Sequence, residues 1–220
     1  MSDVNAFRAR FPALRREYNG RPVAYFDGPG GTQVPQGVAD AMADYLLHHN
    51  ANTDWAYPTS HETDAVIASS RAALADLVGG SAGEIAFGSN MTTLTFHVAR
   101  ALGRGWGPND TIVVTELDHH ANIDPWRALA KERGVRIESV RLDPASGELD
   151  SASLERALLL RPRLLAITAA SNLLGTMPDV AGAAERARTA GALVFVDAVH
   201  YAPHALIDVH ALGADLLACS

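Results

Sequence analysis

The chain has 220 residues, 48% of them hydrophobic, which is enough to bury the core of a substantial domain and argues against intrinsic disorder. Its 18 cationic and 25 acidic residues give a net charge of -7, so the composition disfavours binding to nucleic acid or to an anionic membrane surface. A single cysteine, Cys219, excludes an intramolecular disulfide, a Cys-rich zinc site and a CxxC redox pair, and it favours a reducing cytoplasm.

Strands and helices are predicted to alternate along the chain. This alternation is typical of βαβ units, so we expect a three-layer α/β/α fold with a mainly parallel sheet. We expect residues 1–22 to form an amino-terminal helical segment and residues 23–220 to form one large domain. Apolar runs and turn residues predict strands at 23–26, 84–87, 111–115, 135–140, 164–168 and 192–196 and helices at about 35–46, 59–79, 91–102, 125–133, 151–160 and 178–190.

The amino-terminal segment is charged and amphipathic rather than uniformly apolar. It lacks the apolar stretch of a signal peptide, and no run of 18 apolar residues occurs anywhere in the chain. We therefore expect neither a secretory signal nor a membrane span.

Polar residues gather where four of the predicted strands end. The carboxyl ends of parallel strands share one edge of a sheet and form its ligand crevice, so we expect these residues to converge. Convergence of four loops is a stronger functional signal than any loop alone. The residues are Ser89, Asn90 and Thr92 after the first of these strands, Asp118, His119 and His120 after the second, Ser171 and Asn172 after the third, and Asp197 and His200 after the last.

The GSNMTT loop runs directly into the helix predicted at 91–102. A helix start offers unpaired backbone N–H groups and about half a positive charge, which together attract phosphate. Asn90 or Thr92 could equally serve only as a helix cap. The loop by itself leaves both interpretations open.

The next two features also allow more than one interpretation. His119 and His120 could form a stacking platform, ligate a metal or be ordinary partly buried polar residues. Asp197 ends the apolar strand ALVFV, so its carboxylate emerges at the rim of a low-dielectric interior and needs a cationic or hydrogen-bonding partner. A ligand, a nearby arginine or a helix cap could supply that partner.

Five motifs follow one another along the chain: FDGPGGTQVP, FGSNMTT, ELDHHANIDPW, SNLLGTMPDV and VDAVHYAPH. In this order and spacing they resemble the class V aminotransferase family of fold type I pyridoxal-phosphate enzymes, and within it the cysteine desulfurase-like branch. The resemblance covers Val23 to Ser220 but only the amino-terminal part of the family's usual length. It implies the large domain of the pyridoxal-phosphate-dependent transferase fold.

The resemblance also implies roles for individual residues around the cofactor, pyridoxal 5'-phosphate. Asp197 would lie on the ring nitrogen, where a carboxylate keeps that nitrogen protonated and the cationic ring withdraws electrons from the substrate's α-carbon. The other implied contacts are the backbone around Met91 and the hydroxyls of Thr92 and Ser220 on the phosphate, His119 against the face of the ring and Asn172 against its edge.

The chain departs from the family pattern in two places. His200 stands where most desulfurases carry glutamine beside the cofactor's phenolic oxygen; imidazole can also donate a hydrogen bond there. The Schiff-base lysine of the family is expected about three residues beyond Ser220 and is absent from this chain. Its one lysine, Lys131, lies in the amphipathic stretch PWRALAKERG, where a solvated surface role is expected.

Two other functions compete with this hypothesis. Asp118, His119 and His120 spell the motif of the DHH phosphoesterases, metal-dependent hydrolases to whose ligand set Asp197, His200 and His204 could contribute. Against this, the first predicted strand is followed by Asp27 alone rather than by paired aspartates. The second alternative is a noncatalytic fragment that binds phosphate-bearing ligands.

The family resemblance implies a cytoplasmic homodimer that acts on an amino acid. Desulfuration, transamination and epimerisation all remain open, so the parent enzyme could be a transferase or a lyase. No nucleic-acid, membrane or metal partner is expected. Without the lysine, we expect this chain alone to be inactive.

Overall fold

The computed structural model describes residues 3–28 and 30–220, and the chain divides into two compact units, Met1–Arg71 and Ala72–Ser220. Each unit is described by itself. Pro29, in the FDGPGGTQVP motif, lies outside the described residues. No helix of the described chain is long and apolar enough to cross a membrane. The predicted division after residue 22 stays a prediction.

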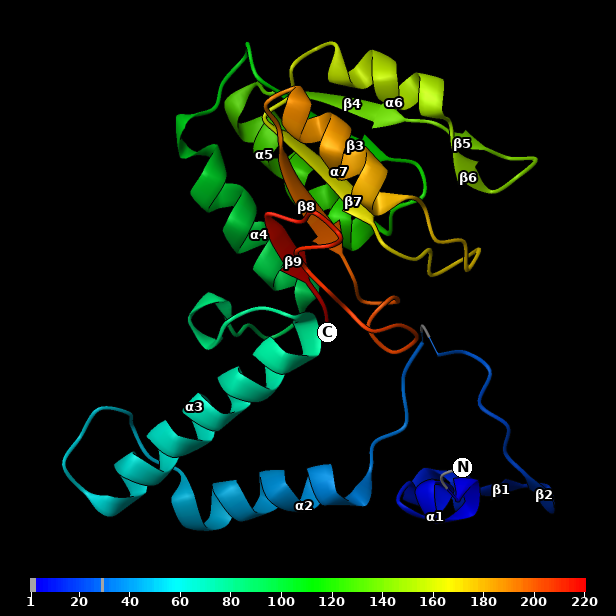
Figure 1. Ribbon diagram of the computed structural model, residues 1–220. Coiled ribbons are helices and arrows are strands. Elements are labelled where there is room, and N and C mark those ends of the chain that lie inside the picture. Colours follow the sequence, from blue (N-terminus) through cyan, green and yellow to red (C-terminus); the bar gives the residue numbers. More distant parts are fainter. Residues whose placement is uncertain (1–2, 29) are drawn as a thin grey trace. The chain divides into compact units, whose positions relative to one another are not determined.

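The first unit consists of short elements and two longer helices (Figure 1). The predicted strand at 23–26 is wrong: this segment is irregular, with the Phe26 side chain 94% exposed and no neighbouring strand within the described unit. The elements are α1 (Val4–Ala9), the 3-10 turn η1 (Pro12–Arg15), the hairpin β1 (Glu17–Tyr18) and β2 (Arg21–Pro22), α2 (Gln36–Asp44), the π-helical turn η2 (Tyr45–His49) and α3 (Pro58–Val78), which continues into the second unit.

Helices α2 and α3 confirm the helices predicted at about 35–46 and 59–79, but apolar side chains on both are exposed. Val38, Met42 and Leu46 share one face of α2 and its π-helical continuation, and each is about half exposed or more. Val66 on α3 is also exposed. A helical period fixes which side chains share a face, whereas burial also requires a surface to cover that face.

The second unit is built on a five-stranded parallel sheet in the order β4-β3-β7-β8-β9. Helices cover both of its faces, which confirms the predicted three-layer α/β/α fold (Figure 1). The strands are β3 (Thr111–Thr115), β4 (Arg136–Val140), β7 (Leu164–Thr168), β8 (Leu193–Asp197) and β9 (Leu216–Ala218), and the helices are α4 (Met91–Leu102), α5 (Asp124–Arg133), α6 (Ser151–Leu158) and α7 (Val180–Thr189).

Alternation along each strand separates two apolar cores. Ile112 and Val114 of β3 face the core that α4 and α5 cover, whereas Val113 between them faces the core under α6 and α7. In the first core the rings of Trp126 and Phe195 meet edge to face, with centroids 5.4 Å apart. Each such buried side chain stabilises the fold by about 1.5–3 kcal/mol relative to its exposed state. The sheet is therefore a rigid base for the loops at its edge.

Three details of the second unit differ from the sequence prediction. The predicted strand at 84–87 is wrong, because Glu84 ends the 3-10 turn η3 (Ala82–Glu84) and the residues after it have irregular backbone. Strand β9 and the hairpin of β5 (Leu142–Asp143) and β6 (Glu148–Leu149) were not predicted, because runs of two or three residues carry too little periodicity.

The strand order places a switch point between β3 and β7. From β3 the chain crosses to β4 on one side, whereas from β7 it proceeds through β8 to β9 on the other. Connections that leave two adjacent parallel strands in opposite directions open a crevice at their carboxyl ends. The loops after Thr115 and Thr168 border this crevice, and Asp197 is aligned with Thr168 on the next strand.

Candidate functional site

Asp197 is a buried carboxyl group at the carboxyl end of β8, with 5% of its surface exposed. One of its oxygens accepts a hydrogen bond of 3.0 Å from the backbone N–H of Val199. Burial raises the pKa of Asp197, while this hydrogen bond and the nearby imidazoles of His119 and His200 oppose the rise. Among the described residues no arginine or lysine pairs with it. A cationic ligand group would fill that role.

His119 precedes the 3-10 turn η5 (His120–Asn122) and is held by hydrogen bonds at two of its atoms. Its Nδ1 accepts a hydrogen bond of 3.1 Å from the N–H of Ala121, and its carbonyl accepts one of 2.9 Å from the N–H of Asn122. The residue is exposed, so a ligand can reach its ring. His120 is also exposed and lies edge-on to His119, with ring centroids 6.2 Å apart.

Asp118 lies behind this turn, and its carboxyl group joins two elements. One oxygen accepts a hydrogen bond from the hydroxyl of Thr115, and the other accepts one of 2.7 Å from the side-chain amide of Asn122. Burial of the carboxyl group raises the pKa of Asp118 to about 7 against these two hydrogen bonds, and the charge of Asp197 adds to the rise. The charge of Asp197 therefore reaches Asp118 behind the turn.

The amino end of α4 forms a second polar region of the crevice. Asn90 caps the helix by accepting a 2.9 Å hydrogen bond from the N–H of Thr93, and the N–H of Met91 donates to the hydroxyl of Ser220 at 3.4 Å. Thr92 and Ser220 are exposed. Within the described chain, the N–H and hydroxyl groups of Thr92 have no hydrogen-bond partner. The capping interpretation is thus confirmed for Asn90, and Thr92 stays available to a ligand.

The loop after β7 turns sharply at residues 171–176. The Ser171 hydroxyl accepts hydrogen bonds from the N–H groups of Leu173 and Leu174 at 3.3 and 3.2 Å, and the N–H of Ser171 donates to the carbonyl of Thr176. Ser171 is therefore a turn residue. Asn172 next to it is partly buried at the start of this turn.

The structure thus brings most of the predicted residues to one edge of one sheet. Direct contact or electrostatic influence links His119, Asp197 and His200 at one end of the crevice, and Met91 and Ser220 at the other. Sequence reasoning missed the roles of Thr115 and Asn122. The spacing of Asp118, Asn122 and Trp126, four residues apart each time, is the signal that could have identified this group.

The metal-site alternative finds no support in the geometry. Across residues 3–28 and 30–220, no group of three or more His, Cys, Asp or Glu side chains is arranged to hold a metal ion. Both carboxyl oxygens of Asp118 accept hydrogen bonds instead, one from Thr115 and one from Asn122. A DHH phosphoesterase, in which these side chains would converge on metal ions, is therefore not supported.

Lys131 lies away from the crevice. It is exposed in the last turn of α5, a helix that begins beyond the carboxyl end of β3 and leads back to the start of β4. Gly134 after it, in a left-handed conformation at φ 73°, approaches Pro108 before β3. The predicted surface role of this lysine agrees with its position.

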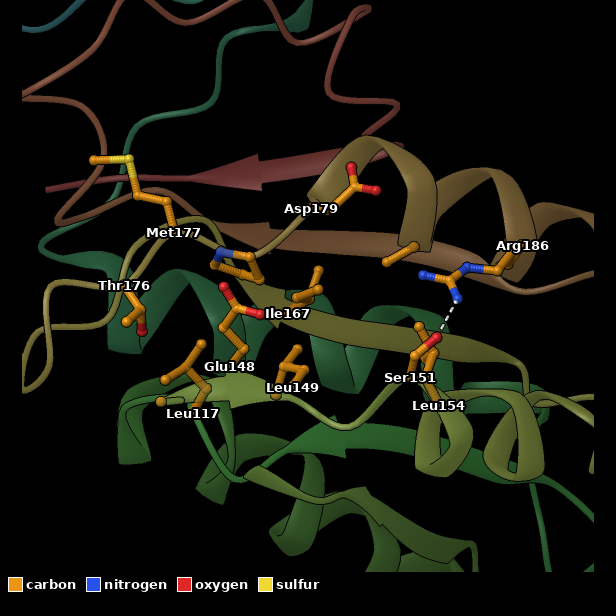
Figure 2. A pocket seen from close by; sticks show the side chains of 13 residues that line it. Leu117, Glu148, Leu149, Ser151, Leu154, Ile167, Thr176, Met177, Asp179 and Arg186 are labelled. Carbon is orange, nitrogen blue, oxygen red and sulfur yellow. Dashed lines mark hydrogen bonds between the residues drawn. The ribbon is translucent and has the colours of Figure 1, made fainter. Parts of the chain in front are cut away.

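A separate hollow of about 400 Å³ lies on the α6–α7 side of the sheet (Figure 2). Leu117, Leu149 and Ile167 form part of its apolar wall, and Arg186 at one end donates a hydrogen bond of 3.1 Å to the Ser151 hydroxyl. None of the residues predicted to bind a cofactor lines it. This hollow offers a rival location for a ligand, which experiment can distinguish from the crevice.

Comparison with known proteins agrees with the family that the motifs resemble. The family described as "Aminotransferase class-V" matches residues 24–220. This chain belongs to the class V aminotransferase family. A cysteine desulfurase from Serratia proteamaculans (strain 568) is 37% identical over 215 residues, which cover 96% of this chain and 53% of that protein.

Solved structures support the class V assignment. The apo structure of a cysteine desulfurase from Thermococcus onnurineus NA1 matches with a TM-score of 0.90 and 31% identity, over 100% of this chain and 53% of that one. An Escherichia coli cysteine desulfurase matches with a TM-score of 0.83 and 28% identity, over 100% and 54%. The class V chain described here therefore spans about half the length of the relatives it matches.

Proposed function

We propose that this chain is the cofactor-binding part of a pyridoxal-phosphate-dependent enzyme that acts on an amino acid, of the cysteine desulfurase-like type. The observation that carries the proposal is the buried Asp197 carboxyl group at the switch-point crevice, with two imidazoles close to it and no cationic side chain paired with it in the described chain. The class V aminotransferase family is pyridoxal-phosphate-dependent, and the residues of this chain at the crevice fit that cofactor.

The ring end of the crevice fits a protonated pyridine. A pyridinium N–H would donate to the free side of the Asp197 carboxylate and offset the cost of burying that charge. The exposed ring of His119 would stack on one face of the cofactor, while His200 would donate to its phenolic oxygen. Asn172, at the start of its turn, would contact the ring's edge.

The phosphate end fits a dianion. The unpaired N–H of Thr92 lies in the first turn of a twelve-residue helix, where the helix dipole adds positive potential. The hydroxyls of Thr92 and Ser220 can donate as well, and the Met91 N–H is already directed at Ser220. These contacts are charge-assisted hydrogen bonds, which are stronger than bonds between neutral groups.

When bound, pyridoxal phosphate supplies an electron sink that stabilises negative charge at a substrate's α-carbon. The residues of this chain bind and orient that group: Asp197 holds the ring proton, His119 excludes water from one face, and the α4 amino end anchors the phosphate. Desulfuration, transamination and epimerisation share these requirements. A cytoplasmic homodimer, as in the family resemblance, is part of the proposal.

Equilibrium dialysis of the purified chain against pyridoxal phosphate tests the proposal. The variant K131R controls for imine formation on the exposed lysine, and pyridoxine phosphate, which has no aldehyde, controls for covalent capture in general. We expect one site per chain, unchanged affinity in K131R and at least about tenfold weaker binding in D197A, which removes a charge-assisted hydrogen bond.

Binding that disappears in K131R, or that D197A leaves unchanged, would contradict the proposal. Borohydride reduction followed by intact-mass analysis then locates any adduct. A specific adduct on Lys131 with turnover of an amino acid would replace the predicted site with a different one. Specific binding without turnover is the result expected for this chain alone, whose one lysine is Lys131.

A further inference from the structure

We propose that Asp118 is a positioning residue of the crevice: its carboxyl group ties the end of β3 to the η5 turn and thereby holds the imidazole of His119 in place for stacking. The stacking role of His119 rests on the proposed function. The hydrogen bonds that position it do not.

The tie spans the segment that carries His119. Thr115 is the last residue of β3 and donates its hydroxyl hydrogen to one oxygen of Asp118, while the Asn122 side chain, at the end of η5, donates to the other. The Thr115 hydroxyl oxygen also accepts a 3.2 Å hydrogen bond from the N–H of Leu117. His119 lies between the two anchored points and has little freedom to shift along the chain.

Asn122 is itself fixed from behind. Its side chain is fully buried, and its carbonyl oxygen accepts a 3.4 Å hydrogen bond from the indole N–H of Trp126, which is also fully buried. Trp126 packs against Phe195 of β8, the strand that ends in Asp197. The chain of contacts therefore connects the position of His119 to the apolar core under the crevice.

The local bonds of η5 complete the constraint. Ala121 donates its N–H to Nδ1 of His119, so the ring orientation follows the orientation of the turn. If Asp118 were removed, the turn would lose both of its side-chain anchors while the short backbone bonds within it would remain. The ring would then move with a loosened turn instead of staying over the crevice.

No attractive charge among the groups that act on Asp118 holds its carboxyl group in place of the hydrogen bonds. The charged or titratable group that acts on it from the neighbouring strands is Asp197, a like charge, and the other influences are hydrogen bonds from Thr115, Asn122 and the backbone of Thr168. An attractive ion pair is therefore not what holds Asp118. Its neutral isostere should consequently preserve the positioning.

A double-mutant cycle on the full chain tests this role. The variants are D118A, H119A and D118A/H119A, with D118N as the conservative variant and D76N as a control at an exposed helical aspartate. Two quantities are measured: the dissociation constant for pyridoxal phosphate, and the induced circular dichroism of the bound cofactor, which reports the environment of its ring.

If Asp118 acts through His119, D118A weakens binding about tenfold and reduces the induced signal, yet it adds little to H119A. D118N restores binding to within about threefold of wild type because its oxygen accepts from Asn122 and its amide donates to Thr115. Additive effects of D118A and H119A, or unchanged binding in D118A, would overturn the inference.

A measurement without cofactor separates this inference from the proposed function. Carbon-13 relaxation of the His119 ring reports its order directly, and we expect greater mobility in D118A than in wild type, D118N or D76N. Failure of every variant, wild type included, to bind pyridoxal phosphate would refute the proposed function only. An equally ordered His119 ring in D118A would refute the positioning role.

Discussion

The two ends of the crevice are built on opposite physical principles. The ring end contains two carboxyl groups that folding shields from water, with Asp197 only 5% exposed and Asp118 partly buried and held by its hydrogen bonds. The phosphate end consists of exposed hydroxyls and an N–H group at a helix terminus. A buried carboxylate lowers the stability of the fold until it is protonated or paired with a cation. An exposed hydrogen-bond donor costs little stability without a ligand, because water can accept its hydrogen bond.

The largest expected effect concerns Asp118 and pH. Its pKa is raised from 3.8 to about 7, so the folded protein holds this proton more tightly than the unfolded chain does. The stability this provides is present at acid pH and is lost progressively as the pH rises toward 7. The side chain of D118N is neutral in both the folded and the unfolded state. Its free energy of unfolding should therefore exceed that of wild type by a margin that grows from about pH 4 to 7 and reaches at most about 4 kcal/mol.

Urea unfolding at pH 4.5, 6 and 8 measures this margin. The phosphate-end variant S220A should show no comparable pH dependence, because it alters no titratable group. A margin for D118N that is the same at all three pH values would show that the Asp118 carboxyl group is not buried as described.

Substitution of Asp197 should move stability and affinity in opposite directions. In D197N the side-chain oxygen still accepts from the Val199 N–H, but the buried charge is gone. Because burial raises the pKa of Asp197, the charged form costs stability at neutral pH, so the cofactor-free variant should melt above wild type. Affinity for pyridoxal phosphate should fall by about 10- to 100-fold, since the neutral amide can accept a hydrogen bond from a pyridinium but cannot form an ion pair with it.

Thermal melts at pH 7.5 with and without pyridoxal phosphate give both quantities for D197N. A lower melting temperature without cofactor would mean that a cation of the protein already pairs with Asp197. An unchanged affinity for pyridoxal phosphate would show that the ring nitrogen of the cofactor does not bind at Asp197.

The phosphate end should show affinity loss without a change in stability. T92A removes one exposed hydroxyl donor, and S220A removes another together with the acceptor of the long 3.4 Å hydrogen bond from the Met91 N–H, so each should weaken binding of pyridoxal phosphate by about three- to tenfold and change stability little. Pyridoxal without the phosphate should bind the variants and the wild type alike. A melting temperature lowered by several degrees in either variant would contradict the view that this end is structurally undemanding.

The smallest expected effect is that of His200. H200Q replaces one hydrogen-bond donor with another beside the expected position of the phenolic oxygen, so the affinity should change by less than about threefold. The absorption spectrum of the bound cofactor should shift, because its phenolic oxygen meets a different donor. A spectrum identical to that of wild type would place His200 outside the site.

The sequence predicted the sheet best where the strands are fully buried. Strand β3 was predicted at its observed limits, since an uninterrupted β-branched run between polar residues permits few alternatives. Residues 23–26 have a similar apolar content but pair with no strand in the described chain. A strand needs a neighbour as well as a composition, and composition alone does not provide one.

The sequence predicted which residues converge at the candidate site better than it predicted the hydrogen bonds between them. Strand ends can be placed at a common edge from the βαβ pattern, which brought His119 and Asp197 together correctly. The bond from Asp118 to Asn122 depends on a 3-10 turn whose geometry no periodicity encodes. Tertiary packing, which the sequence pattern does not reveal, therefore determines which polar side chains of this turn are buried.

The central claim is that one crevice at the carboxyl edge of the sheet binds both ends of pyridoxal phosphate. Amide chemical-shift mapping of the K131R chain during titration with the cofactor tests it most directly. The account predicts saturable shifts at Thr92, His119, Asn172, Asp197 and Ser220 together. Shifts confined to the hollow around Leu149 and Arg186, or no saturable shifts at all, would contradict it.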